Sequence, residues 1–243
     1  MTRIRLIRHA QSAANAGLPT DDPGSIPLTP EGNQQSKAFA GTITSAPDLI
    51  ISSPYLRAMD TALPTASRYP DVPFEVWAVE EFTYLAPNRF AGTTQADRKP
   101  YVESYWSNGD AALVDGPGAE SFEHLLGRAR AMLARLADLD AQDVQVFSHG
   151  QFIRAVAWVI KHSASSSPDR MREFRAADVG EPLGNCCSYQ LLFDGGMWTV
   201  EHQLDPSGQV ALIDGFCNAP KSIQVDDAED RLFGSGSRLA GLY

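Results

Sequence analysis

The chain opens on a mostly apolar segment, Ile4 to Ile7, that ends abruptly in Arg8 and His9. A short apolar run of this kind is typical of a buried strand. The residues that follow such a strand lie at its carboxyl end, which is the edge where open α/β sheets bind ligands. Arg8 has a planar guanidinium group suited to phosphate, and His9 can act as a nucleophile or a proton carrier near neutral pH.

A second segment repeats this pattern late in the chain. The residues from Asp143 to Ser148 form an apolar strand that is followed by His149 and Gly150, and a helix is expected over residues 151–161. One histidine at the end of a strand is more often structural than catalytic. Two of them at the ends of strands in one sheet favour a shared site, because ligands bind at that edge.

The rest of the chain alternates between strand and helix patterns, which is typical of the α/β class. Further strands are expected at residues 48–53 and 74–79, and a hairpin at 185–202 that turns at Gly195 and Gly196. Helices are expected at Pro30 to about Thr44 with Thr29 as N-cap, from Pro54 with Ser53 as N-cap, and after Ser121. We find no internal repeat and no clear linker, so the 243 residues are interpreted as a single domain.

The helix expected after Pro54 places Arg57 in its first turn. There the guanidinium group lies beside the positive end of the helix dipole, where an anion would bind. Pro64 is expected to end or kink this helix. On the helix after Ser121, the polar residues His124 and Arg128 are expected at the surface.

Residues 82–118 are expected to form an irregular, aromatic and basic segment between regular elements. Its length suggests a lid or a substrate-recognition insert, although a simple packed excursion of the chain would look similar. The residues that hint at a pocket for a ligand with further polar or anionic groups are Tyr84, Arg89, Arg98, Lys99, Tyr101 and Trp106. Glu80 and Glu81, just before the segment, form a carboxylate pair of which at most one enters a given pocket, because neighbouring strand residues face opposite ways.

The formal charge of −10 argues against a nucleic-acid surface and against an anionic membrane. An anionic substrate therefore requires a local basic pocket. The three cysteines, of which Cys186 and Cys187 are adjacent, cannot form a secreted disulfide framework and have no zinc-type spacing with a histidine. With neither a signal core nor a long apolar run in the sequence, we expect a soluble cytoplasmic protein.

Taken together, the motifs resemble the histidine phosphatase superfamily, branch 1, the phosphoglycerate-mutase-like group. The resemblance spans roughly residues 3 to 155 and is carried by Leu6 to Ser12 with Asn15, Leu28 to Gly32 with Gln35, Ser52 to Ala62, Pro117 to Ser121, and Ser148 to Gly150. It implies a three-layer α/β/α sandwich around a mostly parallel sheet. Within a domain of residues 1–243, we expect the insert at about 82–118 and a C-terminal extension at about 204–243, which could wrap over the body or support a subunit contact.

The resemblance also implies a set of roles. His9 is the expected nucleophile and forms a phosphohistidine, provided that a backbone carbonyl holds its other ring nitrogen as a donor. Arg8, Arg57 and His149 supply positive charge, and Asn15 adds a neutral donor. Glu81 is the expected proton shuttle, with Glu80 as the competing donor. Gly150 and Tyr84 complete the expected substrate contacts, and no metal or other cofactor is implied.

The sequence departs from the family pattern in two places. Ala10 replaces the usual glycine, so the backbone there must avoid positive φ. The run from Glu81 to Leu85 replaces a glycine-containing run after the carboxylate, which leaves the choice of proton donor more open.

We expect a phosphomonoester hydrolase that acts on a small phosphorylated metabolite. The mutases' characteristic arginine pair and proline-rich run are not found after the acid, so mutase-type phosphoryl transfer is the alternative within the family. A non-catalytic member that binds a phospho-ligand or a protein partner is an alternative of another class, and a homodimer is possible. The extracellular acid-phosphatase branch fits less well, given the missing signal segment and disulfides.

Overall fold

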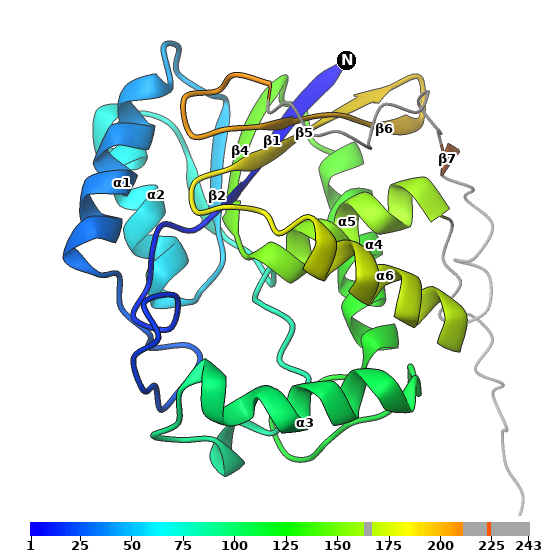
Figure 1. Cartoon of the computed structure of the whole chain (residues 1–243). Coiled ribbons are helices and arrows are strands. Elements are labelled where there is room, and N and C mark those ends of the chain that lie inside the picture. The colour runs from blue at the N-terminus through cyan, green and yellow to red at the C-terminus, as the bar shows by residue number, and fades with distance from the viewer. Residues whose placement is uncertain (163–166, 211–222, 225–243) are drawn as a thin grey trace, which may run out of the picture.

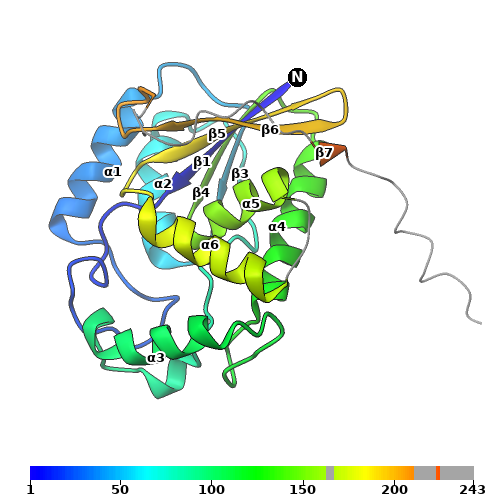
Figure 2. The same cartoon turned by 45° about the vertical axis from the view of Figure 1, so that its right-hand side comes forward.

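The computed structural model describes residues 1–162, 167–210 and 223–224. In this part of the chain a seven-stranded sheet has the order β3-β2-β4-β1-β5-β6-β7 (Figure 1; β3 is labelled in Figure 2). The strands are β1 (Thr2–Arg8), β2 (Leu49–Ser52), β3 (Phe74–Val76), β4 (Asp143–Ser148), β5 (Ser188–Asp194), β6 (Met197–Leu204) and β7 (Ile223–Gln224). The helices are α1 (Pro30–Thr42), α2 (Leu56–Arg68), α3 (Gln95–Asn108), α4 (Phe122–Ala137), α5 (Gly150–His162) and α6 (Pro168–Gly180).

The helices cover both faces of the sheet. In both views α1 and α2 lie on one face and α4, α5 and α6 on the other, while α3 lies beyond the end of the sheet that is far from the N-terminus (Figure 1, Figure 2). The four strands β3, β2, β4 and β1 run parallel, and β5 to β7 extend the sheet with antiparallel pairings. The α/β/α sandwich expected from the sequence is thus confirmed, and so is the hairpin formed by β5 and β6.

The register between β1 and β4 determines where the polar strand ends lie. Ile7 pairs with Phe147, and Arg8 pairs with Ser148. Because the two strands are parallel, neighbouring and in this register, the residues that follow them, His9 and His149, emerge side by side at one edge of the sheet.

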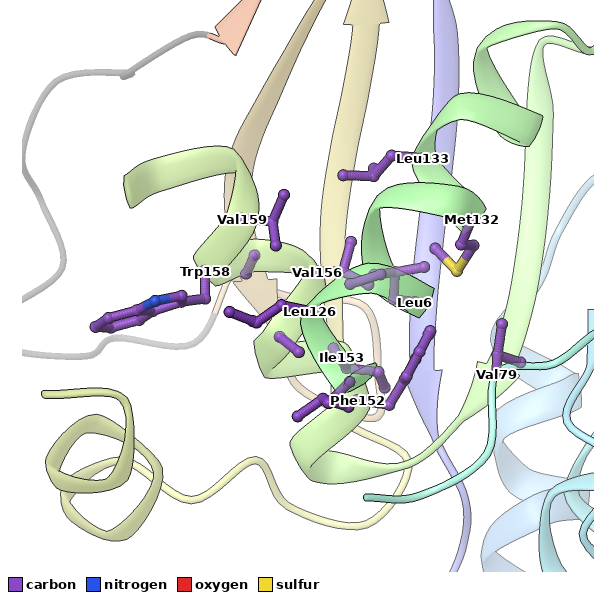
Figure 3. Packing of buried hydrophobic residues seen from close by; sticks show 14 of the residues in the cluster. Leu6, Val79, Leu126, Met132, Leu133, Phe152, Ile153, Val156, Trp158 and Val159 are labelled. Carbon is purple, nitrogen blue, oxygen red and sulfur yellow. The ribbon is translucent and has the colours of Figure 1, made fainter. Parts of the chain in front are cut away.

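Most of the apolar core lies between the sheet and the layer of α4, α5 and α6. Figure 3 shows Leu126 and Leu133 of α4 and Ile153 of α5 near Leu6 of β1. These side chains are almost fully buried, and burial of each contributes about 1.5–3 kcal/mol. A smaller core on the opposite face holds α1 and α2 against the sheet. The edge of the sheet at which His9 and His149 emerge is therefore supported by packed helices on both faces of the sheet.

The structure confirms two of the predicted helix caps and corrects the third. Thr29 caps α1 by accepting a hydrogen bond from Gly32 N, and Ser121 caps α4 by accepting one from His124 N. Ser53 does not cap α2, which begins only at Leu56.

Pro64 was expected to end or kink α2, and it does not end the helix, which continues to Arg68. Proline removes one backbone donor and crowds the preceding turn. That local cost is outweighed by the tertiary packing of α2, where Ala58, Thr61, Ala62 and Thr65 are buried.

Residues 82–118 are more regular than the sequence suggested. They contain a 3₁₀ turn at Pro87–Arg89 and the helix α3. A capping box starts this helix: the Thr94 hydroxyl accepts from Asp97 N, while the Asp97 carboxylate accepts from Thr94 N. The expected C-terminal extension begins with the end of β6, but residues 211–222 and 225–243 lie outside the described part of the chain. No helix of the described residues is long and apolar enough to cross a membrane.

Candidate active site

The structure brings the two strand-terminal histidines together. The His9 backbone N–H donates to the Ser148 carbonyl at 2.9 Å, which extends the β1–β4 ladder by one residue. The ring centroids of His9 and His149 lie 5.1 Å apart, and both side chains are buried. Because each follows a strand of the same parallel pair, their proximity is a direct consequence of the sheet register.

The surroundings of His9 define one state of its ring. Nδ1 lies 2.7 Å from the Ala10 carbonyl, which can only accept, so Nδ1 carries the proton. Nε2 accepts a hydrogen bond from Arg57 Nε at 3.1 Å. Burial, together with the charges of Arg57 and Arg8, lowers the pKa of His9 well below 6.5. The ring is therefore neutral at pH 7, with its lone pair on the nitrogen that faces Arg57.

His149 is held from one side only. Its Nε2 lies 2.9 Å from the Ser53 hydroxyl, whereas its Nδ1 is buried and has no hydrogen-bond partner in the described part of the chain. Burial and the charge of Arg57 lower the pKa of His149 well below 6.5. A buried ring nitrogen without a partner is rare, because the lost hydration is not replaced. It is explained if a ligand supplies the missing partner. Ser53, which the sequence assigned to a helix cap, thus positions this imidazole.

Arg8 and Arg57 bring positive charge to the same edge. Arg57, in the first turn of α2, is buried and donates through Nη1 to the Pro23 carbonyl at 2.6 Å. Arg8 donates through Nη1 to the Leu183 carbonyl, and its buried Nε has no partner among the described residues. Neither guanidinium group forms an ion pair there. Arg57 is buried and Arg8 half-buried, and a dehydrated cation without a direct ion-pair partner is costly, so this arrangement favours an anionic ligand.

Gly150 lies at the start of α5 directly beside Arg8. A Cβ atom at Gly150 would come within 3.5 Å of Arg8 Nε. This distance is an ordinary van der Waals contact, so the structure shows Gly150 packed against Arg8.

Asn15 is held so that its amide N–H groups, which have no acceptor among the described residues, can donate to a ligand. Its side-chain oxygen accepts from Ser12 Oγ at 3.2 Å and from Asn185 Nδ2 at 3.1 Å. Asn185 also donates to the His9 carbonyl at 2.9 Å. No local sequence pattern indicated this role for Asn185, because the contact joins residues far apart in the chain.

The structure separates the two neighbouring carboxylates. Glu81 Oε1 accepts from the backbone N–H groups of Phe82 at 3.0 Å, Gln151 at 3.1 Å and Phe152 at 3.3 Å, so it lies at the N-terminus of α5. Burial raises the pKa of Glu81, and the charge of Arg57 opposes this effect. A carboxyl group with a raised pKa near Arg57 is suited to carry a proton.

Glu80 points to a different partner. Its Oε2 lies 3.3 Å from Arg128 Nη1, and Arg128 also pairs with Glu120 and donates to the Glu80 carbonyl. The expectation that Arg128 lies at the surface is therefore wrong: its side chain is 15% exposed, against 67% for His124 on the same helix. Arg128 holds the backbone just before Glu81 and leaves only Glu81 at the site.

The loop after His9 shows how Ala10 is accommodated. Cys186 is the only non-glycine residue with positive φ in the described part of the chain, so the backbone at Ala10 suits an alanine. Ala10 N donates to Thr61 Oγ1 at 3.0 Å. On α1, a Cβ atom at Gly32 would meet the Gln11 carbonyl oxygen at 2.0 Å. Only glycine permits the loop to pack this closely on α1.

A pocket of about 560 Å³ opens at Arg57 and Glu81, whereas His9 and His149 are not among the residues that line it. The pocket is lined on the sheet side by Arg57, Glu81 and Gln151. The first loop contributes Thr20, Asp21, Pro23 and Ile26. The insert contributes the remaining lining residues, which are Phe82, Thr83, Tyr84, Leu85, Pro87, Phe90, Gln95, Ala96, Arg98, Lys99 and Val102. Tyr84 thus faces the pocket, as the sequence suggested.

Other residues of the predicted insert lie elsewhere. Trp106 is buried in the core, Arg89 forms an ion pair with Asp115, and Tyr101 is 48% exposed. None of these three lines the pocket. Within the described residues, no group of three or more His, Cys, Asp and Glu side chains could hold a metal ion.

Comparisons with known proteins agree on one fold. A family model described as the histidine phosphatase superfamily (branch 1) matches residues 4–206, whereas no curated protein matches the chain. Similar solved structures include a putative α-ribazole-5′-P phosphatase from Escherichia coli (22% identity, TM-score 0.65, covering 86% of this chain and 100% of that one). Others are a mycobacterial glucosyl-3-phosphoglycerate phosphatase (24%, 0.64, 83% and 98%) and a phosphoserine phosphatase from Entamoeba histolytica (23%, 0.63, 84% and 96%).

Proposed function

The chain belongs to the histidine phosphatase superfamily, and on this basis we propose that it hydrolyses a small phosphorylated metabolite through a phosphohistidine formed on His9. The observation that carries the proposal is the set of unsatisfied groups around His9. Arg8 and Arg57 have no ion-pair partner in the described structure, and His149 Nδ1 has no hydrogen-bond partner there. A tetrahedral phosphoryl dianion would satisfy all three.

In the first step the phosphoryl group takes the place beside His9 where Arg57 now donates. The His9 Nε2 lone pair attacks phosphorus, an N–P bond forms, and the ester P–O bond breaks. Negative charge spreads over the equatorial oxygens in the transition state, and Arg8, Arg57 and His149 stabilise it. Glu81, in its protonated form, gives its proton to the leaving alkoxide oxygen.

In the second step the same carboxylate works in the opposite direction. Glu81, now ionised, removes a proton from a water molecule in the pocket. The water oxygen forms a bond to phosphorus, the N–P bond breaks, and inorganic phosphate leaves. Glu81 ends protonated and His9 neutral, so both groups return to their starting states.

The pocket and the structural relatives support a small-metabolite substrate. The cavity of about 560 Å³ beside Glu81 has room for the alcohol part of a phosphomonoester, since pockets for small molecules typically measure about 300–1,000 Å³. The relatives named above are a putative α-ribazole-5′-P phosphatase, a glucosyl-3-phosphoglycerate phosphatase and a phosphoserine phosphatase. We propose a small phosphorylated metabolite as the substrate of this chain as well.

The test is phosphate release from phenyl phosphate in the presence of a chelator. We expect turnover by the wild type, loss of turnover in His9→Ala, and a fall of about 10²-fold or more in His149→Ala, because each removes a group that contacts the reacting phosphoryl. His124→Ala, which removes an exposed histidine of α4, serves as the control and should retain full activity. Full turnover in purified His9→Ala refutes the nucleophile, and binding without release by the wild type favours a non-catalytic binding protein.

A further inference from the structure

Glu81 lies in a segment that no regular secondary structure holds in place. The strand β3 ends at Val76, and residues 77–86 belong to no helix or strand. The Glu81 carboxylate accepts from the N–H groups of Gln151 and Phe152, but these bonds leave the backbone of the segment unsupported. A group that transfers a proton must be placed accurately, since a misplacement of about 1 Å can cost about 10²-fold in rate. The segment therefore needs an anchor of its own.

Arg128 of α4 supplies this anchor on the side that precedes Glu81. Its Nη1 donates to the carbonyl oxygens of Ala78 and Glu80, both at 3.2 Å, and its Nη2 donates to the Glu80 carbonyl at 3.2 Å. The guanidinium carbon also lies 4.9 Å from the centre of the Phe152 ring. Because the N–H of Phe152 binds the Glu81 carboxylate, Arg128 contacts both the backbone before Glu81 and a residue that holds its side chain.

Glu120 provides the anchor on the other side. Its carboxylate accepts from Arg128 Nε at 2.9 Å and from Nη2, and its backbone N–H donates to the Thr83 carbonyl at 2.9 Å. The side chains of Arg128 and Glu120 are only 15% and 12% exposed. A two-bonded pair between a guanidinium group and a carboxylate is strongly directional. One shielded ion pair thus binds the chain both before and after Glu81.

Arg128 acts on Glu81 through position rather than through charge. Its guanidinium group faces two carboxylates, Glu80 and Glu120, so its own charge is balanced locally. The cation with the largest influence on the pKa of Glu81 is Arg57. Neither Arg128 nor Glu120 lines the pocket, so a direct contact with substrate does not account for their placement.

We propose that Arg128 and Glu120 are positioning residues for the proton donor: their ion pair fixes the segment so that the Glu81 carboxyl group meets the leaving oxygen. This inference rests on the proposed function, because the proton transfer by Glu81 is part of it. If the pair acts in this way, its loss slows only those substrates whose leaving group needs the proton. An ester with a stable leaving anion is then nearly unaffected.

The test is kcat/KM of Arg128→Lys on glycerol 1-phosphate and on 4-nitrophenyl phosphate. Lysine keeps the positive charge, but a single ammonium group cannot reproduce the planar fork that holds two carbonyl oxygens and Glu120 together. We expect about 10- to 100-fold less activity on the alkyl ester and a loss of less than about threefold on the nitrophenyl ester. Glu120→Gln weakens the pair while keeping the backbone bond to Thr83, and should show the same preference.

A double-mutant cycle distinguishes positioning from general damage to the fold. In a Glu81→Gln background, Arg128→Lys should change the rate on glycerol 1-phosphate by less than about threefold, because the group that it positions has lost its proton. The matched control is Arg135→Met, which removes a cation from the same helix and breaks the ion pair with Glu75. It should affect both esters equally or not at all. Urea unfolding of every variant measures lost stability separately.

The outcomes for the pair and for the proposed function differ. Equal losses of Arg128→Lys on both esters, or a loss that adds fully to that of Glu81→Gln, overturn the inference and leave the proposed function in place. If Arg128→Lys does not fold, Glu120→Gln is judged by the same two criteria. A wild type that does not hydrolyse glycerol 1-phosphate, or a Glu81→Gln variant without a preference between the esters, refutes the role of Glu81 itself and the inference with it.

Discussion

Replacing Glu81 by glutamine tests whether catalysis depends on the proton that this residue is proposed to carry. Glutamine has nearly the same shape, and its side-chain oxygen can still accept from the N–H groups of Phe82, Gln151 and Phe152. The fold and the start of α5 should therefore be preserved, and the change removes only the acidic proton. Because general acid catalysis typically contributes about 10²–10⁴-fold, we expect a loss of this size, equal to about 3–5 kcal/mol of barrier, for an alkyl phosphate.

The leaving group provides the decisive comparison. An alkoxide needs the proton in order to leave, whereas nitrophenolate is a stable anion that leaves without it. The assay is kcat/KM of Glu81→Gln on glycerol 1-phosphate and on 4-nitrophenyl phosphate, with Glu80→Gln as the matched control. We expect the large loss on the alkyl ester only, and a much smaller one in Glu80→Gln, because Glu80 is engaged with Arg128. Equal losses on both esters, or a larger loss in Glu80→Gln, would refute this role.

The pH dependence of the same step follows from the raised pKa of Glu81. The carboxyl group is protonated below its pKa, so turnover of the alkyl ester should fall as pH rises through that value. In Glu81→Gln this limb of the profile should disappear. If the pH–rate profile of Glu81→Gln still falls with rising pH in the same range, the fall belongs to a group other than Glu81.

Two further predictions concern stability and are measured by urea unfolding. Gly32→Ala should destabilise the fold by about 1–3 kcal/mol or more, because the new Cβ would meet the Gln11 carbonyl oxygen at 2.0 Å. The control is Gly41→Ala on the same helix, where a Cβ would have nothing within 4 Å, so this change should be neutral or stabilising. Equal effects of the two substitutions on the free energy of unfolding would refute the packing argument. His9 and His149 have folded-state pKa values well below 6.5, so the unfolded chain binds more protons as pH falls below 6.5, and stability should fall by up to about 1.4 kcal/mol per pH unit for each histidine. A pH-independent stability between about pH 7 and pH 5 would contradict the buried neutral state of both rings.

The sequence predicted best those features that depend on local pattern. Strand-terminal residues such as His9 and His149 are placed by the strand itself, and the cap at Thr29 is a short-range signal. The helix α3 was missed because only Tyr105 and Trp106 on it are buried, so its apolar periodicity is weak. The capping box was the available signal.

Contacts between distant segments were beyond such reasoning. Arg128 looked like a surface residue because its partners Glu80 and Glu120 approach it only in the folded chain. The same holds for Asn185, which contacts His9 and Asn15 although it lies far from both in the sequence. Ser53 matched the pattern of a helix cap, yet its hydroxyl lies against His149 instead. In each case a long-range polar contact overrides the local pattern.

The central claim is that His9 carries the phosphoryl group between the two steps. The most direct measurement is rapid quenching of the enzyme with excess phenyl phosphate, under conditions that keep phosphohistidine intact, followed by mass spectrometry of its peptides. We predict a phosphoryl group that is labile in acid and stable in base on the peptide containing His9, with none on that containing His149 and none in His9→Ala. Phosphate release that proceeds without any such species, or a phosphoryl group found on another residue, would contradict the account.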